Sequence, residues 1–254
     1  LAVRHLSAPI SSRVRTRQGQ LRFPHLRCRV YSDTMFSEQK SLTGNTCAQV
    51  FLAGSCGFSD LYCMPTKGEA GDRLNTFITT YGIPEELTTD NAKEETLGTW
   101  AQVRKKYLIH QTVTEPHTPQ QNKTELEIGA LKRHYRRLMH NQSIPESLWD
   151  FGLKHTARIR SFTARDSLNG RTPYELLTGQ TPDISEIMEF SLYDWIKYYD
   201  SAAFPSKREF LGRWLGPAEH VGQALCYYIL KDNGQVIAHS SVRPLTPDEL
   251  DRKS

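Results

Sequence analysis

Two stretches decide the fold: residues 88–95 read TTDNAKEE, and residues 115–139 read EPHTPQQNKTELEIGALKRHYRRLM. The first places Asp90 directly after a short strand-like run, and the second places Glu125 near the start of a basic helix. Strand ends and packed helices are rigid supports, which side chains that bind a metal require. Asp90 and Glu125 are therefore candidate metal ligands.

The second stretch predicts a helix with two possible first turns. Thr118, Pro119 and Gln121 form a capping box with proline at the first helical position, and Thr124 with Glu127 offers a later start. Apolar residues then recur at three- and four-residue spacing, which predicts one buried stripe. The stripe consists of Ile128, Leu131, Tyr135, Leu138 and Met139.

Glu125 and Glu127 border this stripe on opposite sides. At about 100° per residue, Glu125 shares its side with Gly129, Lys132 and Arg136. An acid beside two cations suits a place where a metal and a phosphate backbone meet. A solvated helix face with intrahelical ion pairs would give the same pattern. From the helix alone both interpretations stay open, as does the choice between the two glutamates.

Length and composition set the outer bounds. A chain of 254 residues with 38% hydrophobic residues can form one sizeable core and a smaller second domain. No apolar run approaches the roughly 20 residues that span a bilayer, so we expect no membrane partner. Five cysteines without a CxxC pair predict neither a disulfide framework nor a zinc cluster. The first residue, Leu1, favours a fragment or a piece of a longer polyprotein.

The positive charge is concentrated at the N-terminus. Residues 1–32 hold seven arginines and no acid, although the whole chain carries a net charge of only +4. Without those seven, 25 basic residues face 28 acidic ones, a charge of about −3. We expect residues 1–26 to form a flexible basic arm along phosphates, with Arg13, Arg15 and Arg17 as candidate contacts. A disordered or truncated end is the alternative.

From residue 27 the pattern predicts an α/β fold, a mixed sheet with flanking helices. In order, the expected elements are strands at 27–36, 47–53 and 58–64, a helix around 74–81, a strand at 87–89, a helix around 100–107, a strand at 109–113 and the basic helix. Asp33, on the first strand, would lie beside Asp90 if their two strands are neighbours.

Beyond residue 142 the sequence predicts a helical extension and linker (residues 143–200), then a small β-barrel-like domain and tail (residues 201–254). Capping boxes at residues 143–146 and 172–175 each predict a helix start. The Asp-Asn-Gly sequence at residues 232–234 predicts a hairpin. The small domain would bind DNA, contact another protomer or only pack against the core.

Three segments in this order resemble the catalytic core of retroelement integrases, with those of copia-type LTR retrotransposons most similar. They are SDTMFS around Asp33, TTDNA around Asp90 and PHTPQQNKTE ending at Glu125. The later segments IPESLWDFGL, GRTPYELLTGQTPDISE, FLGRWLGPA, YYILKDNGQVIAHSSV and VRPL also resemble that family. The resemblance implies an RNase H-like core (residues 27–142) that processes DNA 3′ ends and transfers strands.

The resemblance also implies the roles of individual residues. Asp33, Asp90 and Glu125 would be catalytic and would hold two Mg²⁺ ions, which Mn²⁺ could replace, with Asp33 bridging both. Two such ions stabilise the attacking and leaving oxygens of phosphoryl transfer, and Mg²⁺ prefers oxygen ligands. The candidate phosphate contacts on the basic helix are Lys123, Lys132, Arg133 and Arg136.

Two departures from the family pattern keep the choice of glutamate open. Ala92 and Lys123 stand where many relatives have glycine, and Glu125 follows Asn122 at three residues rather than four. A loop shorter by one residue is the simplest explanation for that spacing.

The resemblance implies double-stranded DNA, both element ends and target, as partner. It also implies a homo-oligomer located in the nucleus, or in a cytoplasmic particle before nuclear entry. Two other functions remain: an inactive integrase relic that only binds nucleic acid, and a nuclease that cuts without joining.

Overall fold

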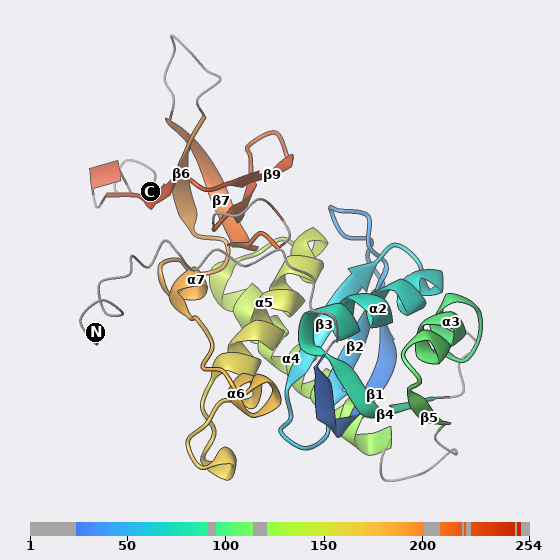
Figure 1. Cartoon of the computed structure of the whole chain (residues 1–254). Helices are drawn as coiled ribbons and strands as arrows, with labels where there is room; N and C mark the ends of the chain where they lie inside the picture. Colours follow the sequence, from blue (N-terminus) through green and yellow to red (C-terminus); the bar gives the residue numbers. More distant parts are fainter. Residues whose placement is uncertain are drawn as a thin grey trace, which may run out of the picture.

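The computed structural model describes residues 24–90, 95–113, 121–200, 209–219, 221, 225–246 and 248–249, with the backbone alone for 121–123. Two five-stranded sheets are joined by helices (Figure 1). No helix in these ranges combines the length and apolar character needed to cross a bilayer.

The first sheet is mixed, as predicted. Its strands are β1 (His25–Phe36), β2 (Cys47–Ala53), β3 (Ser59–Met64), β4 (Ile83–Thr89) and β5 (His110–Val113), in the order β3-β2-β1-β4-β5. The pairs β1–β2 and β2–β3 are antiparallel, whereas β1–β4 and β4–β5 are parallel. β4 begins at Ile83, earlier than predicted, because Pro84 occupies the beginning of the strand, where a missing N–H group is tolerated.

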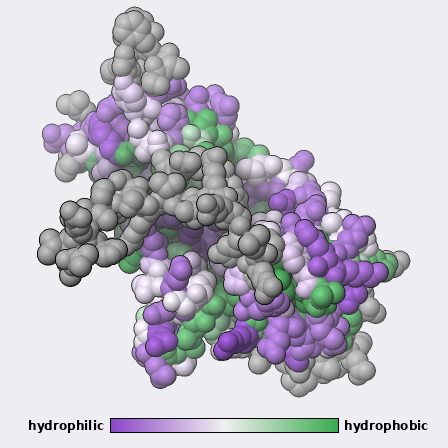
Figure 2. Space-filling model, in the orientation of Figure 1, coloured by the Kyte–Doolittle hydropathy of each residue, from purple (hydrophilic) through white to green (hydrophobic). Residues whose placement is uncertain are grey.

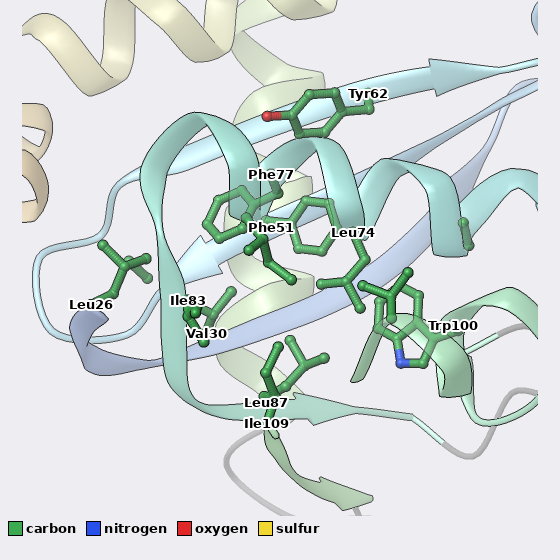
Figure 3. Close-up of a cluster of buried hydrophobic side chains, with 14 of the residues drawn as sticks. Leu26, Val30, Phe51, Tyr62, Leu74, Phe77, Ile83, Leu87, Trp100 and Ile109 are labelled. Atoms are coloured by element: carbon green, nitrogen blue, oxygen red, sulfur yellow. The ribbon is translucent and has the colours of Figure 1, made fainter. Parts of the chain in front are cut away.

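One face of this sheet is covered by α2 (Ala70–Tyr81), which follows the short η2 (Lys67–Glu69), and by α3 (Gly98–Lys106). Figure 3 shows the aromatic centre of this core. The Phe51 ring stacks on Phe77 and on Trp100, with ring centroids 4.7 Å and 6.3 Å apart. α2 and α3 touch closely at Gly71, since a Cβ atom there would lie 2.4 Å from the backbone nitrogen of Trp100.

The outer surface of these two helices is polar. On the face of the molecule shown in Figure 2, hydrophilic residues dominate the described surface over α2 and α3, and hydrophobic residues form small separate patches. α2 and α3 therefore bury their apolar sides against the sheet and turn polar sides to solvent.

The other face is covered by α4 (Gln121–Gln142), η4 (Glu146–Leu148) and α5 (Trp149–Phe162). Of the predicted stripe, Ile128 and Leu131 are buried here and Tyr135 packs beside them, whereas Leu138 and Met139 pack against the core of the second sheet. The alternative helix start at Thr124 is wrong, because α4 already includes Gln121 and Thr124 is buried inside the helix. The proposed capping residues at positions 118 and 119 lie outside the described residues.

The extension continues with η5 (Asp166–Leu168), α6 (Pro173–Thr178) and α7 (Ser185–Met188). Its second capping box is confirmed, since the Thr172 hydroxyl accepts a hydrogen bond from the Glu175 N–H group at 3.0 Å. The first, at residues 143–146, is wrong. Ser143 has a left-handed conformation with φ of 50° and follows the end of α4, and no side chain caps η4.

The second sheet contains β6 (Trp195–Tyr199), β7 (Glu209–Pro217), β8 (Tyr227–Leu230), β9 (Val236–His239) and β10 (Val242–Pro244). All its pairs are antiparallel, and the predicted hairpin is the β8–β9 pair. In the described part of the chain the sheet is open rather than barrel-like, because β10 and β9 lie at opposite edges. It also includes β6, which precedes residue 201.

α5 joins the two sheets. It packs on β3 of the first sheet, and its His155 ring meets the edge of Trp214 in the second sheet at 5.7 Å. Arg158 of α5 also pairs with Glu186 of α7 at 3.1 Å. The apolar core of the second sheet includes side chains from the end of α4 and the start of α5.

His155 should make the protein sensitive to acid. Burial, with the nearby Arg158 charge, lowers the pKa of His155 to about 4, whereas an unfolded chain would protonate this ring near pH 6.5. The stability that comes from burying the neutral His155 ring is therefore fully present above pH 6.5 and is lost as the pH falls towards 4. At pH 5 the loss amounts to about 2 kcal/mol.

Replacing the ring should remove this dependence. In His155→Phe, which keeps an aromatic contact with Trp214, we expect the drop in free energy of unfolding between pH 7 and pH 5 to shrink by about 2 kcal/mol. Urea unfolding at both pH values measures it. His110→Gln is the control, because the His110 side chain is 73% exposed. An unchanged drop in His155→Phe would contradict the prediction.

Candidate functional site

Asp33 lies on β1, and Asp90 directly follows the neighbouring parallel strand β4 at the equivalent position. Tyr31 of β1 pairs with Thr88 of β4, and each aspartate is two residues further along. Neighbouring strands are about 4.8 Å apart, so Asp33 and Asp90 lie side by side where β4 ends. The prediction that Asp33 lies beside the strand ending at Asp90 is confirmed.

The pKa of Asp33 is shifted by burial and by the charged groups around it. The pKa of Asp33 is raised to about 6, mainly by burial and then by the negative charges of Asp90 and Glu125. The N–H group of Thr34, which donates to Oδ1 at 2.7 Å, and the charge of Lys132 act in the opposite direction. All three predicted acids therefore contribute to one local field, in which a bound cation would relieve the repulsion.

The two glutamates of α4 have different surroundings. Glu125 is exposed. Glu127 forms an ion pair with Arg160 of α5 at 2.8 Å and accepts a hydrogen bond from Ser59 of β3 at 3.0 Å. The Glu127 and Arg160 side chains are only 12% and 17% exposed. Glu127 thus ties α4 to α5 and β3, whereas the charge of Glu125 acts on Asp33.

A small hollow lies between the strand ends and α4. It is lined by Tyr31, Ser32, Asp33, Thr88, Thr89, Asp90 and Thr124. Carboxylate and hydroxyl oxygens are the donors that Mg²⁺ prefers, so the aspartate pair fits a divalent cation. Among the described residues, however, no group of three or more His, Cys, Asp or Glu side chains is placed to hold a metal ion.

The candidate phosphate contacts are only partly described. Lys132 is half-buried close enough to influence Asp33, and Arg133 and Arg136 are exposed on α4. These cations lie on the helix that carries Glu125. The side chain of Lys123 and the arm residues Arg13, Arg15 and Arg17 lie outside the described part of the structure.

One acid beside the site was not singled out from the sequence. Glu95 is 1% exposed, and its carboxyl group accepts hydrogen bonds from Gln49 and, at 3.4 Å, from Ser32. Burial raises the pKa of Glu95 well above its ordinary value, the Gln49 hydrogen bond opposes this, and the charge of Asp90 adds to it. The available signal was Gln49, the one polar residue within the otherwise apolar β2.

Comparison with known proteins identifies the fold. No protein-family model and no curated protein sequence matches the chain. Among solved structures, the catalytic core domain of HTLV-2 integrase, in complex with magnesium and in a trimeric form, aligns with a TM-score of 0.50 and 14% identity. The alignment covers 61% of this chain and 99% of that one.

A second similar structure extends over more of the chain. A simian T-cell lymphotropic virus intasome, in complex with the PP2A regulatory subunit B56 gamma, aligns with a TM-score of 0.50 and 16% identity. This alignment covers 97% of the present chain and 91% of the intasome chain. At these identities the likeness shows the fold alone, which is that of the RNase H-like catalytic cores of retroviral integrases.

Proposed function

We propose that this chain is an integrase of the copia type, which processes DNA 3′ ends and transfers strands by metal-dependent phosphoryl transfer. One observation carries the proposal: Asp90, directly after β4, stands beside Asp33 of the adjacent parallel strand β1. The charge of Glu125, which acts on Asp33, agrees with it. The integrase-core fold of the first sheet and its helices supports the same function.

In this proposal each part of the site has a chemical task. Asp33, Asp90 and Glu125 would hold magnesium, which when bound supplies positive charge to the attacking and leaving oxygens. Lys132, Arg133 and the other cations of α4 would hold the phosphate backbone without reading its sequence. In end processing, water would attack a phosphodiester and displace the 3′-oxygen of the DNA end. In joining, that 3′-hydroxyl would attack a phosphodiester of the target strand and displace its 3′-oxygen. No covalent protein intermediate is needed.

We also propose double-stranded DNA as the partner, a homo-oligomer as the working form and the nucleus as its place of action, with a cytoplasmic particle before nuclear entry. Support comes from the similar structures, one of which is a trimeric form and the other an intasome. The basic face of α4 suits DNA as well.

A second candidate is a protein that binds nucleic acid without catalysis. It is favoured by one observation, that no three metal-binding side chains among the described residues are grouped for a metal ion. An exposed Glu125 is consistent with it. A nuclease that cuts without joining is the third possibility, and one assay separates all three.

The assay incubates the chain with labelled duplex DNA ends and Mg²⁺. Joined products indicate an integrase, cleavage alone indicates a nuclease, and retention of DNA without either indicates a binding protein. In Asp33→Asn we expect cutting and joining to fall by at least about 100-fold, since a metal contributes several kcal/mol to the transition state. Asp72→Asn, on the exposed side of α2, is the matched control and should keep full activity.

A further inference from the structure

A buried hydrogen-bond network lies behind Asp33, on the sheet face that α3 covers. Ser32 and Thr34 flank Asp33 in β1, and alternation along a strand points both away from the Asp33 side. Gln49 of β2 bonds to both of them. Its amide group donates to the Ser32 hydroxyl at 2.7 Å, and its carbonyl oxygen accepts from the Thr34 hydroxyl at 2.8 Å.

A second set of hydrogen bonds holds the residue before Asp90. The Gln111 amide group of β5 donates to the Thr89 hydroxyl at 2.7 Å and to the backbone carbonyl of Glu95 at 2.8 Å. The indole N–H group of Trp100 in turn donates to Gln111 at 3.2 Å. The position of Thr89 is therefore tied to the backbone of Glu95.

Glu95 joins these two sets. Its backbone belongs to the set around Gln111, and its carboxyl group accepts from Gln49 and Ser32 in the set around Asp33. One of its carboxyl oxygens, Oε2, is buried without a hydrogen-bond partner among the described residues, and the negative charge of Asp90 acts on Glu95. The side chain thus contacts the neighbourhood of both aspartates from a buried position.

We propose that Glu95 is a positioning residue that holds Asp33 and Asp90 at the separation needed to bind a divalent metal. The inference rests on the proposed function in taking these two aspartates as metal ligands. Such ligands work only when they are held within about 0.5 Å of the productive geometry. Groups that orient metal ligands from behind change metal affinity by about 10–100-fold when they are replaced.

The test measures Mn²⁺ binding to the full chain without DNA, from the free Mn²⁺ signal in electron paramagnetic resonance. Asp33→Asn first identifies which binding belongs to this site. Glu95→Gln keeps an acceptor for Gln49 and should leave the Kd within about threefold of the wild type. That change is smaller than the roughly 10-fold minimum expected when a group that orients a metal ligand is lost. Glu95→Met, similar in length but without an acceptor, should raise the Kd by about 10–100-fold.

Two further variants separate positioning from general loss of stability. Asp150→Leu removes another buried carboxyl group, which is 5% exposed and accepts a hydrogen bond from Asn45 at 3.0 Å, outside the network of Gln49, Ser32 and Glu95. It should leave Mn²⁺ affinity unchanged. Ser32→Ala makes a smaller break in the same network and should raise the Kd in the same direction, which covers the case in which Glu95→Met does not fold.

The outcomes are distinct. Unchanged Mn²⁺ affinity in Glu95→Met or Ser32→Ala would overturn the inference, as would an equal loss in Asp150→Leu. Absence of any Asp33-dependent Mn²⁺ binding in the wild type would overturn it too. If the wild type binds Mn²⁺ but neither cuts nor joins DNA, the proposed function fails, and the Mn²⁺ affinities of the variants still decide the role of Glu95.

Discussion

Glu125→Gln should reduce DNA end processing and joining by at least about 100-fold and leave the free energy of unfolding unchanged, because a metal contributes several kcal/mol to phosphoryl transfer. Glu125 is exposed, and its charge acts on Asp33. Glutamine keeps its size and its place on α4 but removes the charge that would bind a metal. DNA retention should therefore survive.

Glu127→Gln is the matched variant, two residues away on the same helix, and it should behave in the opposite way. Its ion pair with Arg160 is largely buried, so loss of the charge should cost about 2 kcal/mol of stability while chemistry continues. Gel assays of joining and urea unfolding of both variants measure the two effects. If Glu127→Gln abolished joining and Glu125→Gln did not, the assignment of the site on α4 would be wrong.

The largest effect on stability is expected from Trp214→Ala. Trp214 is fully buried in the second sheet, where it contacts Phe190, Tyr227 and His155. Removing so large a side chain leaves a cavity, so the free energy of unfolding should fall by about 3–5 kcal/mol. Urea unfolding at pH 7, followed by far-ultraviolet circular dichroism, measures the change.

Trp195→Ala provides the control within the same sheet. Trp195 is only half-buried and stacks on the guanidinium group of Arg213 at 3.6 Å. Its loss should cost about 1 kcal/mol, the usual contribution of a partly exposed cation–π contact. Comparable losses in the two variants would show that Trp214 is not the centre of this core.

The order of elements in the first sheet could be predicted because each element carries a local signal. Strands of β-branched and apolar residues end at turn residues, and the α4 stripe has a clear helical period. The placement of Asp33 beside Asp90 needed one further step, that β1 and β4 are neighbours. That step is not local, and the resemblance to integrases made it plausible before the register was known.

Other features depend on contacts between distant residues and could not be predicted. Whether the second sheet closes depends on its edge strands, which the hairpin signal does not specify. The burial of Glu95 depends on where Gln49 and Ser32 meet, 17 residues apart in sequence. The partner of Glu127 is Arg160, 33 residues away. A polar residue gives no local indication of which distant group will satisfy it.

The core shared between α4, α5 and the second sheet determines where the chain can be shortened. Leu138, Met139 and Phe151 pack against the apolar cluster that contains the core of the second sheet, and the Phe151 ring meets Tyr228 of β8. A fragment that stops before β6 would keep the aspartate pair but leave these side chains uncovered. Apolar patches of this kind promote self-association. An isolated catalytic fragment should therefore aggregate unless these three positions are made polar, whereas a fragment that retains β6–β10 should stay monodisperse.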